Sequence, residues 1–226
     1  MALNKSQTSL GVKIVLVIVA IAMIGFLFPA VFSLFNSSNT SSGATQNTAK
    51  GTLDTIAAKY TAQVAANDQT LQSNPANYAV LVSQGNLYFD WALEVMQAAQ
   101  QNTELGGNDQ PLWLSARQYY ERAAEATKAI DAPVQTDLSI AYFYSGETTQ
   151  AVGTVNKVLA QNPKFAPAWL NLGVFYSAQG DKAKAIAAYE KVLELDPKGT
   201  TTNTDYAKQE IAALKGTTTT TSTTSP

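Results

Sequence analysis

Two adjacent stretches of this sequence repeat the same pattern of residues without a gap. Residues 132–165 align with residues 166–199, a spacing of 34 residues. The recurring positions hold small residues, large apolar residues, one glycine and one proline: Leu138 and Leu172, Ser139 and Gly173, Tyr142 and Tyr176, Gly146 and Gly180, Ala151 and Ala185, Val155 and Tyr189, Val158 and Val192, Pro163 and Pro197. A unit of this length cannot bury its apolar face alone. The sequence therefore predicts a stack of similar units.

The recurring positions have clear physical roles in a helix–turn–helix unit. Gly173 and Ala185 are predicted where the two helices cross, because bulk there would push the backbones apart. Gly180 is expected at the end of the first helix, since glycine accepts the left-handed conformation of a C-cap. Asp181 can then cap the second helix, and Pro197 ends it. Packing is the expected role of each of these residues.

The second copy also carries Trp169, so that it reads W-x-x-L-G-x-x-Y, then A-x-x-x-Y, then a closing proline. This pattern resembles the tetratricopeptide repeat (TPR), a pair of helices of this period. The resemblance covers residues 132–199 closely and about 75–131 more loosely. It implies an all-α solenoid of helical hairpins, about three pairs in all, that winds into a right-handed superhelix and binds protein partners.

A third copy lies upstream and is interrupted. The first-helix pattern recurs in Leu81–Tyr88 and the second-helix pattern only in Ala116–Ala123. Between them we expect an extension of the first helix over Trp91–Gln101 and a loop over Gly106–Gln110. Pro111 then suits the first turn of the next helix. Residues 51–131 are therefore predicted to form a leading helix and a degenerate repeat with an insertion.

The flanks of the repeats are predicted from composition and from the needs of a stack. We expect the leading helix at Leu53–Ala66, and a capping helix at Thr204–Leu214, within residues 200–216, that covers the last repeat. The Thr/Ser-rich residues 217–226 predict a disordered tail. Residues 36–50, rich in Ser, Thr, Asn and Gly, predict a flexible linker.

The segment before this linker is uncharged and almost wholly apolar. Residues 14–35 are long enough, at about 1.5 Å per residue, to cross a bilayer core of roughly 30 Å as a helix. A cleaved signal peptide is the alternative, although its apolar region is usually shorter. Lys5 and Lys13 precede the segment, and no charge follows it until Lys50. Because positive residues remain in the cytoplasm, residues 1–13 are predicted inside and the repeats outside, in a bacterial envelope.

The composition excludes several classes of protein. The chain has no histidine and no cysteine, which removes the commonest general base, thiol catalysis and thiolate metal sites. Its net charge is −2 and it has no basic patch, which argues against nucleic acid. The insertion offers Glu94, Glu104 and Asp109 without a partner base. We therefore expect neither an enzyme nor a cofactor.

In proteins that this chain resembles, the first helices of successive units line a concave groove that holds a peptide. By helical phase, the resemblance implies that this groove is mostly apolar and lacks the Lys and Arg that grip chaperone C-termini in some TPR domains. A competing interpretation has Phe143 and Tyr144 packing on the leading helix or on the insertion. The implied groove residues are Val82, Asn86, Phe89, Thr136, Ile140, Phe143, Tyr144, Leu170, Asn171, Val174 and Ser177.

The resemblance and the apolar segment together favour a membrane-anchored scaffold or adaptor that binds a protein or peptide partner. Similar anchored proteins assemble envelope complexes, in cytochrome c maturation, in cell-wall synthesis at division, or in pilus and secretion systems. A periplasmic chaperone of the holdase type is the alternative, since it would use the same apolar groove for many partners. Trp91 and Trp113 near the insertion also leave self-association open.

Overall fold

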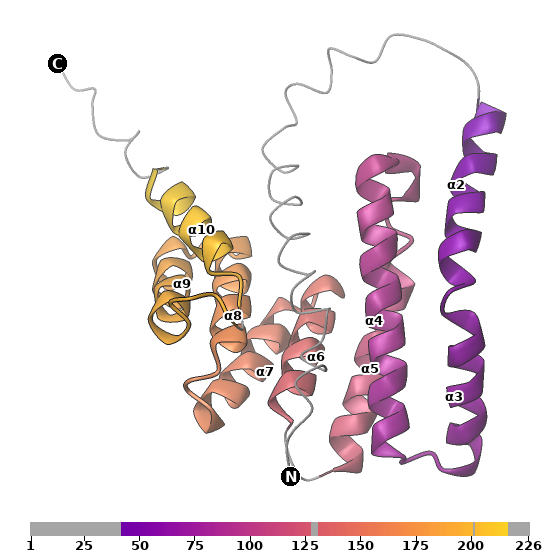
Figure 1. Cartoon of the computed structure of the whole chain (residues 1–226), viewed down its shortest axis with the longest axis horizontal. Helices are drawn as coiled ribbons and strands as arrows, with labels where there is room; N and C mark the ends of the chain where they lie inside the picture. Colours follow the sequence, from indigo (N-terminus) through magenta and orange to yellow (C-terminus); the bar gives the residue numbers. More distant parts are fainter. Residues whose placement is uncertain (1–41, 128–130, 201, 217–226) are drawn as a thin grey trace. The chain divides into compact units, whose positions relative to one another are not determined.

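The computed structural model describes residues 42–127, 131–200 and 202–216. Within these ranges the chain holds nine α-helices and one short 3-10 helix, and no strand (Figure 1). The described residues fall into two compact units, 42–127 and 131–216. The predicted all-α class and the helical-hairpin repeats are confirmed. The right-handed superhelix stays a prediction, because it concerns the placement of one unit on the other.

The unit of residues 42–127 is built from two successive helices that lie along a helical hairpin. In Figure 1, α2 and α3 follow one another beside α4, and both contact it. Helix α4 pairs with α5 as the two arms of the interrupted repeat. The bounds are α2 Ser42–Ala57, α3 Thr61–Ser73, α4 Tyr78–Gln101, the 3-10 helix η2 Thr103–Leu105, and α5 Gln110–Ala126.

Two expectations about the start of this unit were wrong. The single leading helix predicted at Leu53–Ala66 is two helices, separated by a turn at residues 58–60. Residues 42–50, predicted as part of a flexible linker, form the first turns of α2. The reason lies in the partners of α2: α4 and η2 both contact it, and Ile56 of α2 and Leu105 of η2 are buried. The composition of residues 36–50 alone does not show that α4 and η2, which follow much later in the sequence, pack against α2.

The insertion follows its prediction. Helix α4 continues through Trp91–Gln101, and Pro111 lies in the first turn of α5. Residues 107–109 form the turn that precedes α5, and Gly107 has a φ of 82°, a conformation that glycine accepts at little cost. The inserted residues therefore serve the fold, because they lengthen one arm of the hairpin until it can pack against α2.

The unit of residues 131–216 contains two regular repeats and a final helix. Helix α6 pairs with α7 and α8 with α9, α7 contacts α8, and α10 packs on α9. The capping helix predicted at Thr204–Leu214 is confirmed. Its Tyr206 and Ala207 are both buried and follow Leu172 and Gly173 by one repeat length. The bounds are α6 Ala132–Tyr144, α7 Thr148–Gln161, α8 Ala166–Ala178, α9 Lys182–Leu195 and α10 Thr204–Gly216.

The turn within each regular repeat has the geometry that its glycine predicts. Gly146 and Gly180 have φ values of 86° and 78°. The amide of the next residue reaches back to the first helix, from Asp181 N to the carbonyl of Tyr176 at 2.9 Å in the second repeat. This Schellman-type bond satisfies a carbonyl at the helix end. Asp181 also accepts a hydrogen bond from the amide of Lys184 at 3.1 Å, so its predicted role as a cap is confirmed.

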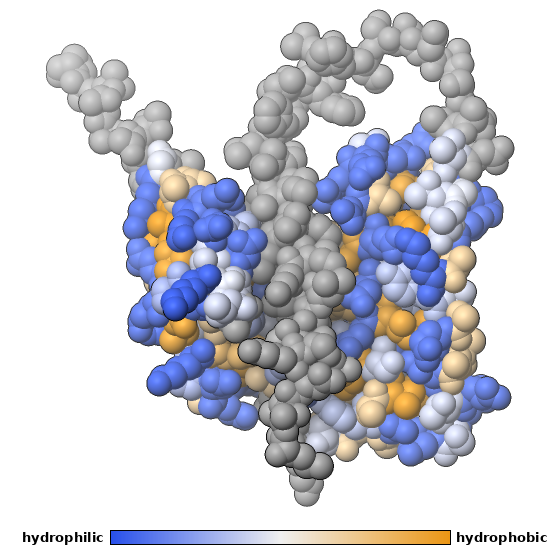
Figure 2. All heavy atoms as spheres, viewed as in Figure 1, coloured by the Kyte–Doolittle hydropathy of each residue, from blue (hydrophilic) through white to orange (hydrophobic). Residues whose placement is uncertain are grey.

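The predicted membrane anchor, residues 14–35, lies outside the described residues, as do residues 1–13, 36–41 and the tail 217–226. Among the helices that are described, none combines the length and apolar character needed to cross a bilayer. Figure 2 shows that the visible surface of each unit is mostly hydrophilic, with smaller apolar areas among the hydrophilic ones. Leu114 of α5, at 44% exposure, is the one large apolar side chain that stands open in the described part.

Candidate peptide-binding groove

The rotation of α8, the first helix of the last repeat, is fixed by a contact with its second helix, α9. In the last repeat the backbone of Gly173 lies against the ring of Tyr189. A Cβ atom at position 173 would lie 2.5 Å from Cε1 of that ring, closer than any real contact. Because α8 has 3.6 residues per turn, turning Gly173 toward α9 turns Leu170, Asn171 and Val174 toward the side of the hairpin where the groove is expected.

The two first helices of this unit touch through aromatic rings. Phe143 of α6 stacks on Phe175 of α8, with 4.8 Å between ring centroids, and meets Tyr144 edge to face at 5.3 Å. Phe143 thus serves the contact between α6 and α8. It is half-buried, as is Tyr144. The structure places both residues at the contact between neighbouring repeats of the unit.

Six side chains of α6 and α8 lie by helical phase on the side where the groove is expected. We call it the α6/α8 face, made of Thr136, Asp137, Ile140, Leu170, Asn171 and Val174. All six are buried: Ile140, Leu170 and Val174 are only 1%, 0% and 4% exposed. The hydroxyl of Thr136 donates to the carbonyl of Ala132 in its own helix at 2.6 Å. The face therefore offers hydrocarbon rather than free hydroxyls.

Two polar groups at equivalent repeat positions interrupt this hydrocarbon. Asp137 and Asn171 are one repeat apart and are 5% and 3% exposed. The side-chain amide nitrogen of Asn171 has no hydrogen-bond partner within the described part of the chain. A buried donor without an acceptor costs about 1–3 kcal/mol. The face is thus chemically suited to an apolar ligand that brings at least one carbonyl oxygen to Asn171.

Asp137 was absent from the predicted site. The sequence could have indicated it, because Asp137 lies one repeat length, 34 residues, before Asn171, which was predicted for the groove. Helical phase places Asp137 on this face, and the structure shows that it is buried.

Ser177, predicted for the groove, belongs to a different contact. Its hydroxyl lies near the phenol of Tyr189 and lowers the pKa of that phenol, against the stronger effect of burial, which raises it. Tyr189 meets Tyr206 of α10 edge to face, with 6.0 Å between centroids. Ser177 therefore lines the junction of α8, α9 and α10.

The residues predicted for the groove in the other unit have different roles. Val82 packs beside the core cluster of Leu71, Leu81 and Ala123. Phe89 is buried and meets Trp113 edge to face at 5.0 Å, so it fills the core rather than a groove. Asn86 is exposed, and its side-chain oxygen accepts a hydrogen bond from the Tyr120 hydroxyl at 2.7 Å.

An aromatic ladder in the same unit was not foreseen. The rings of Tyr60, Trp91, Tyr88 and Tyr119 stack in that order at 5.6, 6.1 and 5.6 Å, each pair within 9° of parallel. The guanidinium of Arg122 lies 5.2 Å from the Tyr119 ring. The ladder joins the turn before α3 to α4 and α5. Only the i, i+3 spacing of Tyr88 and Trp91 could have hinted at it.

The two tryptophans considered for self-association are both engaged in this unit. Trp113 is fully buried, and its indole N–H donates to the carboxylate of Asp109 at 3.0 Å. Trp91 is held in the aromatic ladder between Tyr60 and Tyr88. The expectation that both might expose apolar surface is therefore wrong for Trp113, and Trp91 is only partly exposed.

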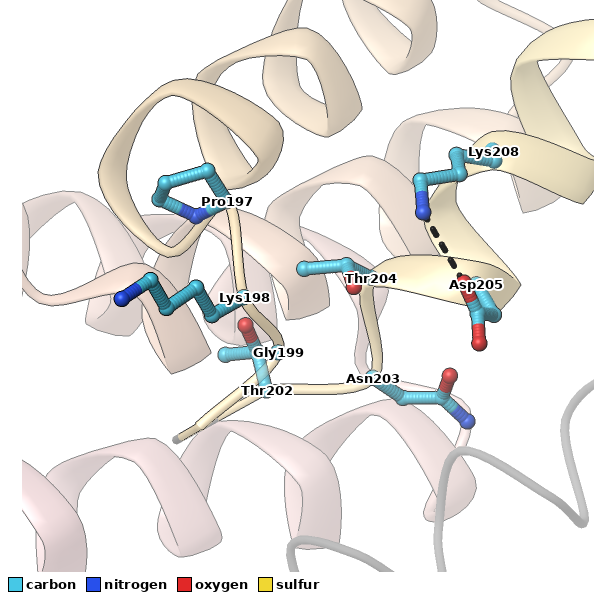
Figure 3. Close-up of a pocket in the computed structure, with 8 residues that line it drawn as sticks. All are labelled: Pro197, Lys198, Gly199, Thr202, Asn203, Thr204, Asp205 and Lys208. Atoms are coloured by element: carbon cyan, nitrogen blue, oxygen red, sulfur yellow. Dashed lines mark hydrogen bonds and ion pairs between the residues drawn. The ribbon is translucent and has the colours of Figure 1, made fainter.

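A polar cavity of about 390 Å³ lies at the loop between α9 and α10. Figure 3 shows its lining, with Lys208 directed at Asp205, to which it forms an ion pair of 2.9 Å. Nearby, the buried Asp196 accepts hydrogen bonds from the amides and hydroxyls of Thr200 and Thr202, at 2.8–2.9 Å. The cavity residues are Pro197, Lys198, Gly199, Thr202, Asn203, Thr204, Asp205 and Lys208. Their bonds hold the loop, and they include no nucleophile with an adjacent base.

In the part of the chain that the structure describes, three or more carboxylate, imidazole or thiolate side chains do not gather closely enough anywhere to hold a metal ion.

Comparison with known proteins agrees with this architecture. Residues 166–198 match the family model described as Tetratricopeptide repeat. A crystal structure of MamA superposes with a TM-score of 0.55 at 23% identity, covering 80% of this chain and 86% of MamA. A second crystal structure of the MamA protein gives 0.51 at 19% identity, covering 81% and 99%. The curated proteins include no match.

The fold and the repeat define a helical-repeat scaffold that presents stacked hairpins. The chain carries one match to the tetratricopeptide repeat family, at residues 166–198, and its helical fold is similar to that of MamA. Scaffolds of this family bind proteins or peptides and are generally not catalytic.

Proposed function

We propose that this protein is a membrane-anchored adaptor that binds an apolar protein segment on the α6/α8 face and so helps to assemble an envelope complex. The observation that carries the proposal is the chemistry of that face. Four of its six side chains end in methyl groups or offer only hydrocarbon to a ligand, and Asn171 adds one unpaired donor. Two adjacent first helices of this kind suit a hydrophobic helix or strand.

The charge of the face supports an apolar partner over an acidic one. Its six positions contain no lysine or arginine, and Asp137 would repel a carboxylate. A C-terminal carboxylate is therefore a poor ligand here. An uncharged segment meets no such penalty, and burial of apolar area gives about 25 cal/mol per Å².

The anchor is part of the same proposal and rests on the sequence. Residues 14–35 are apolar, and the lysines lie only on their N-terminal side. We propose that this segment crosses the membrane with residues 1–13 in the cytoplasm and the repeats outside. Cytochrome c maturation, wall synthesis at division, and pilus or secretion assembly are the envelope processes in which such an adaptor would act.

The experiment is partner capture by crosslinking in intact membranes, using the full chain as bait. The informative variant is Ile140→Thr with Val174→Thr, which adds a hydroxyl to each position; the second change is nearly isosteric, and the first also removes one carbon. Leu114→Thr is the matched control, because Leu114 is an exposed aliphatic residue of the other unit. Helical circular dichroism should be the same in all three proteins.

We expect one dominant partner, lost in the double variant and kept in the control. Equal capture by all three proteins would reject the α6/α8 face as the site. Many weakly bound clients in place of one partner would favour a holdase.

A further inference from the structure

The aromatic ladder of the unit 42–127 is built entirely from side chains that can lose one electron. The rings of Tyr60, Trp91, Tyr88 and Tyr119 stack in that order, with centroids 5.6, 6.1 and 5.6 Å apart and planes within 9° of parallel. This is the offset stack that aromatic rings prefer. Tyrosine and tryptophan are the aromatic residues that give up an electron readily, and phenylalanine is not. Because neighbouring rings lie face to face, an electron can pass along the whole ladder.

Each end of the ladder offers its phenol a proton acceptor. The Tyr60 hydroxyl donates to Oε2 of Glu94 at 2.9 Å, and Oε1 of the same carboxylate pairs with Lys59. The Tyr119 hydroxyl donates to Oδ1 of Asp68 at 3.1 Å. A phenol that loses an electron becomes a strong acid, so a carboxylate already bonded to it can take the proton without movement of the chain. An electron vacancy is therefore most stable on the two terminal tyrosines.

The middle of the ladder is where oxidation would harm the fold most. Trp91 lies between the rings of Tyr60 and Tyr88 and so joins α4 to the turn before α3. Oxygen added to its indole would make the side chain polar and end this packing. Tyr60 and Tyr119 are partly exposed, so a small reductant in solution can reach both ends. Sulfur offers little alternative protection, because the chain has no cysteine and, among the described residues, one methionine, Met96.

We propose that the aromatic ladder is a one-electron relay that draws oxidising equivalents away from Trp91 and delivers them to its terminal tyrosines. An oxidising radical, such as the carbonate radical, takes one electron from Trp91 and becomes carbonate. Tyr60 returns an electron to the indole while its phenol proton passes to Glu94, which leaves an intact tryptophan and a neutral phenoxyl radical. An electron from a small reductant such as ascorbate, with the proton handed back by Glu94, then restores the phenol.

The other half of the ladder works in the same way. Tyr88 refills Trp91, Tyr119 refills Tyr88, and the proton of the Tyr119 phenol passes to Asp68. The relay uses none of the residues of the α6/α8 face. It therefore stands or falls independently of the proposed function.

The test oxidises the full chain with tris(bipyridine)ruthenium(III), made in solution by a light flash with a cobalt(III) quencher. Mass spectrometry of peptides then measures the oxygen added to each tryptophan. Trp169 is the internal reference, because it is partly exposed, as Trp91 is, and belongs to the other unit. The relay variant is Tyr60→Phe, Tyr88→Phe and Tyr119→Phe, which keeps every ring of the ladder and removes every phenol.

A matched variant removes three phenols outside the ladder, Tyr142→Phe, Tyr144→Phe and Tyr176→Phe, each partly exposed in the wild type. We expect Trp91 of the wild type to gain severalfold less oxygen than Trp169. This protection should be lost in the relay variant and kept in the matched variant. Equal oxidation of the two tryptophans in the wild type would overturn the proposal. So would protection of Trp91 that survives in the relay variant, because packing alone would then explain it.

A second measurement keeps the ladder whole and removes its proton acceptors. Glu94→Gln with Asp68→Asn retains all four rings and their hydroxyls. After a flash, transient absorption follows the indole radical as it gives way to phenoxyl radicals, and we expect this conversion to be severalfold slower in the amide variant. An unchanged rate would contradict the relay. The same comparison decides the matter if the relay variant loses its helical circular dichroism.

Discussion

Gly85 and Tyr120 are packed so closely that the glycine has no room for a side chain. A Cβ atom at position 85 would lie 2.6 Å from two carbons of the Tyr120 ring. Gly173 and Tyr189 repeat this relationship in the last hairpin. The glycine and the tyrosine are 35 residues apart in the first case and 16 in the second. The interrupted repeat therefore closes through the same contact as a regular one, in spite of its insertion.

This packing makes a prediction about both glycines. We expect Gly85→Ala and Gly173→Ala each to lower the free energy of unfolding by about 1–3 kcal/mol, because the buried ring cannot yield to the added methyl. Urea unfolding followed by circular dichroism measures the change. Gly153→Ala is the matched control, since it also lies within a helix but meets nothing within 4 Å. It should raise stability by about 0.5–1 kcal/mol, and a loss there would contradict this account of the two glycines.

Asp196 should hold α10 against the last repeat. Its buried carboxylate accepts four hydrogen bonds from Thr200 and Thr202. Asp196→Ala leaves those donors without their acceptor, and we expect a loss of about 1–3 kcal/mol. Hydrogen exchange should show the loss first in α10. Asp205→Ala removes only an exposed ion pair with Lys208 and should cost under about 1 kcal/mol. Equal effects of the two substitutions would refute the special role of Asp196.

Glu210 should make the junction of α8, α9 and α10 sensitive to pH. Burial raises its pKa above the ordinary value of 4.5, against a smaller effect of the Tyr206 hydroxyl. The folded state then binds the proton more tightly than the unfolded state does. Its contribution to stability is present below pH 4.5 and is lost as pH rises through the folded pKa.

We therefore expect Glu210→Gln to gain stability relative to the wild type as pH rises from 4.5 toward neutrality. Thermal unfolding of both proteins across this range measures the difference. Glu194→Gln is the control, because Glu194 is largely exposed, and its difference from the wild type should stay nearly flat. A difference for Glu210→Gln that does not change with pH would show that burial does not govern this carboxyl.

The aromatic ladder should fix the turn between α2 and α3. Tyr60 stacks on Trp91, and its hydroxyl donates to Glu94 at 2.9 Å. Tyr60→Ala should lower stability by about 2 kcal/mol or more, from lost burial and stacking. Tyr60→Phe keeps the stack and loses only the hydrogen bond, so it should cost about 1 kcal/mol. Trp91 fluorescence follows both, and a shift with Phe as large as with Ala would argue against stacking as the cause.

The repeats could be predicted from the sequence because the residues that define them lie close together along the chain. Gly146 and Gly180 mark the turns since few other residues accept a positive φ, and Asp181 marks a cap by its short carboxylate. Even the arms of the interrupted repeat could be matched, because Gly85 and Tyr120 keep the small and large residues that a helix crossing requires. The extension of α4 followed from the helical character of residues 91–101.

The groove was predictable only in part. The repeat register placed Ile140, Leu170 and Val174 on one face, and the structure keeps them together. It could not show that Phe89 turns into the core, because the downstream α5 supplies Trp113 against it. Ser177 was misplaced for a similar reason, since its neighbours Tyr189 and Tyr206 come from α9 and α10.

The sequence by itself determined the helical pairs, their turns and the small residues at each crossing, since each depends on backbone preferences and contacts within one repeat. Tertiary structure alone decided that α2 forms along the lengthened α4, that four aromatic side chains stack from the turn before α3 across α4 and α5, and that the side chains of the α6/α8 face are buried. These features depend on which side chains meet across long separations in sequence. Local sequence preferences do not specify such contacts. Whether a side chain is buried or exposed depends on the residues that pack against it.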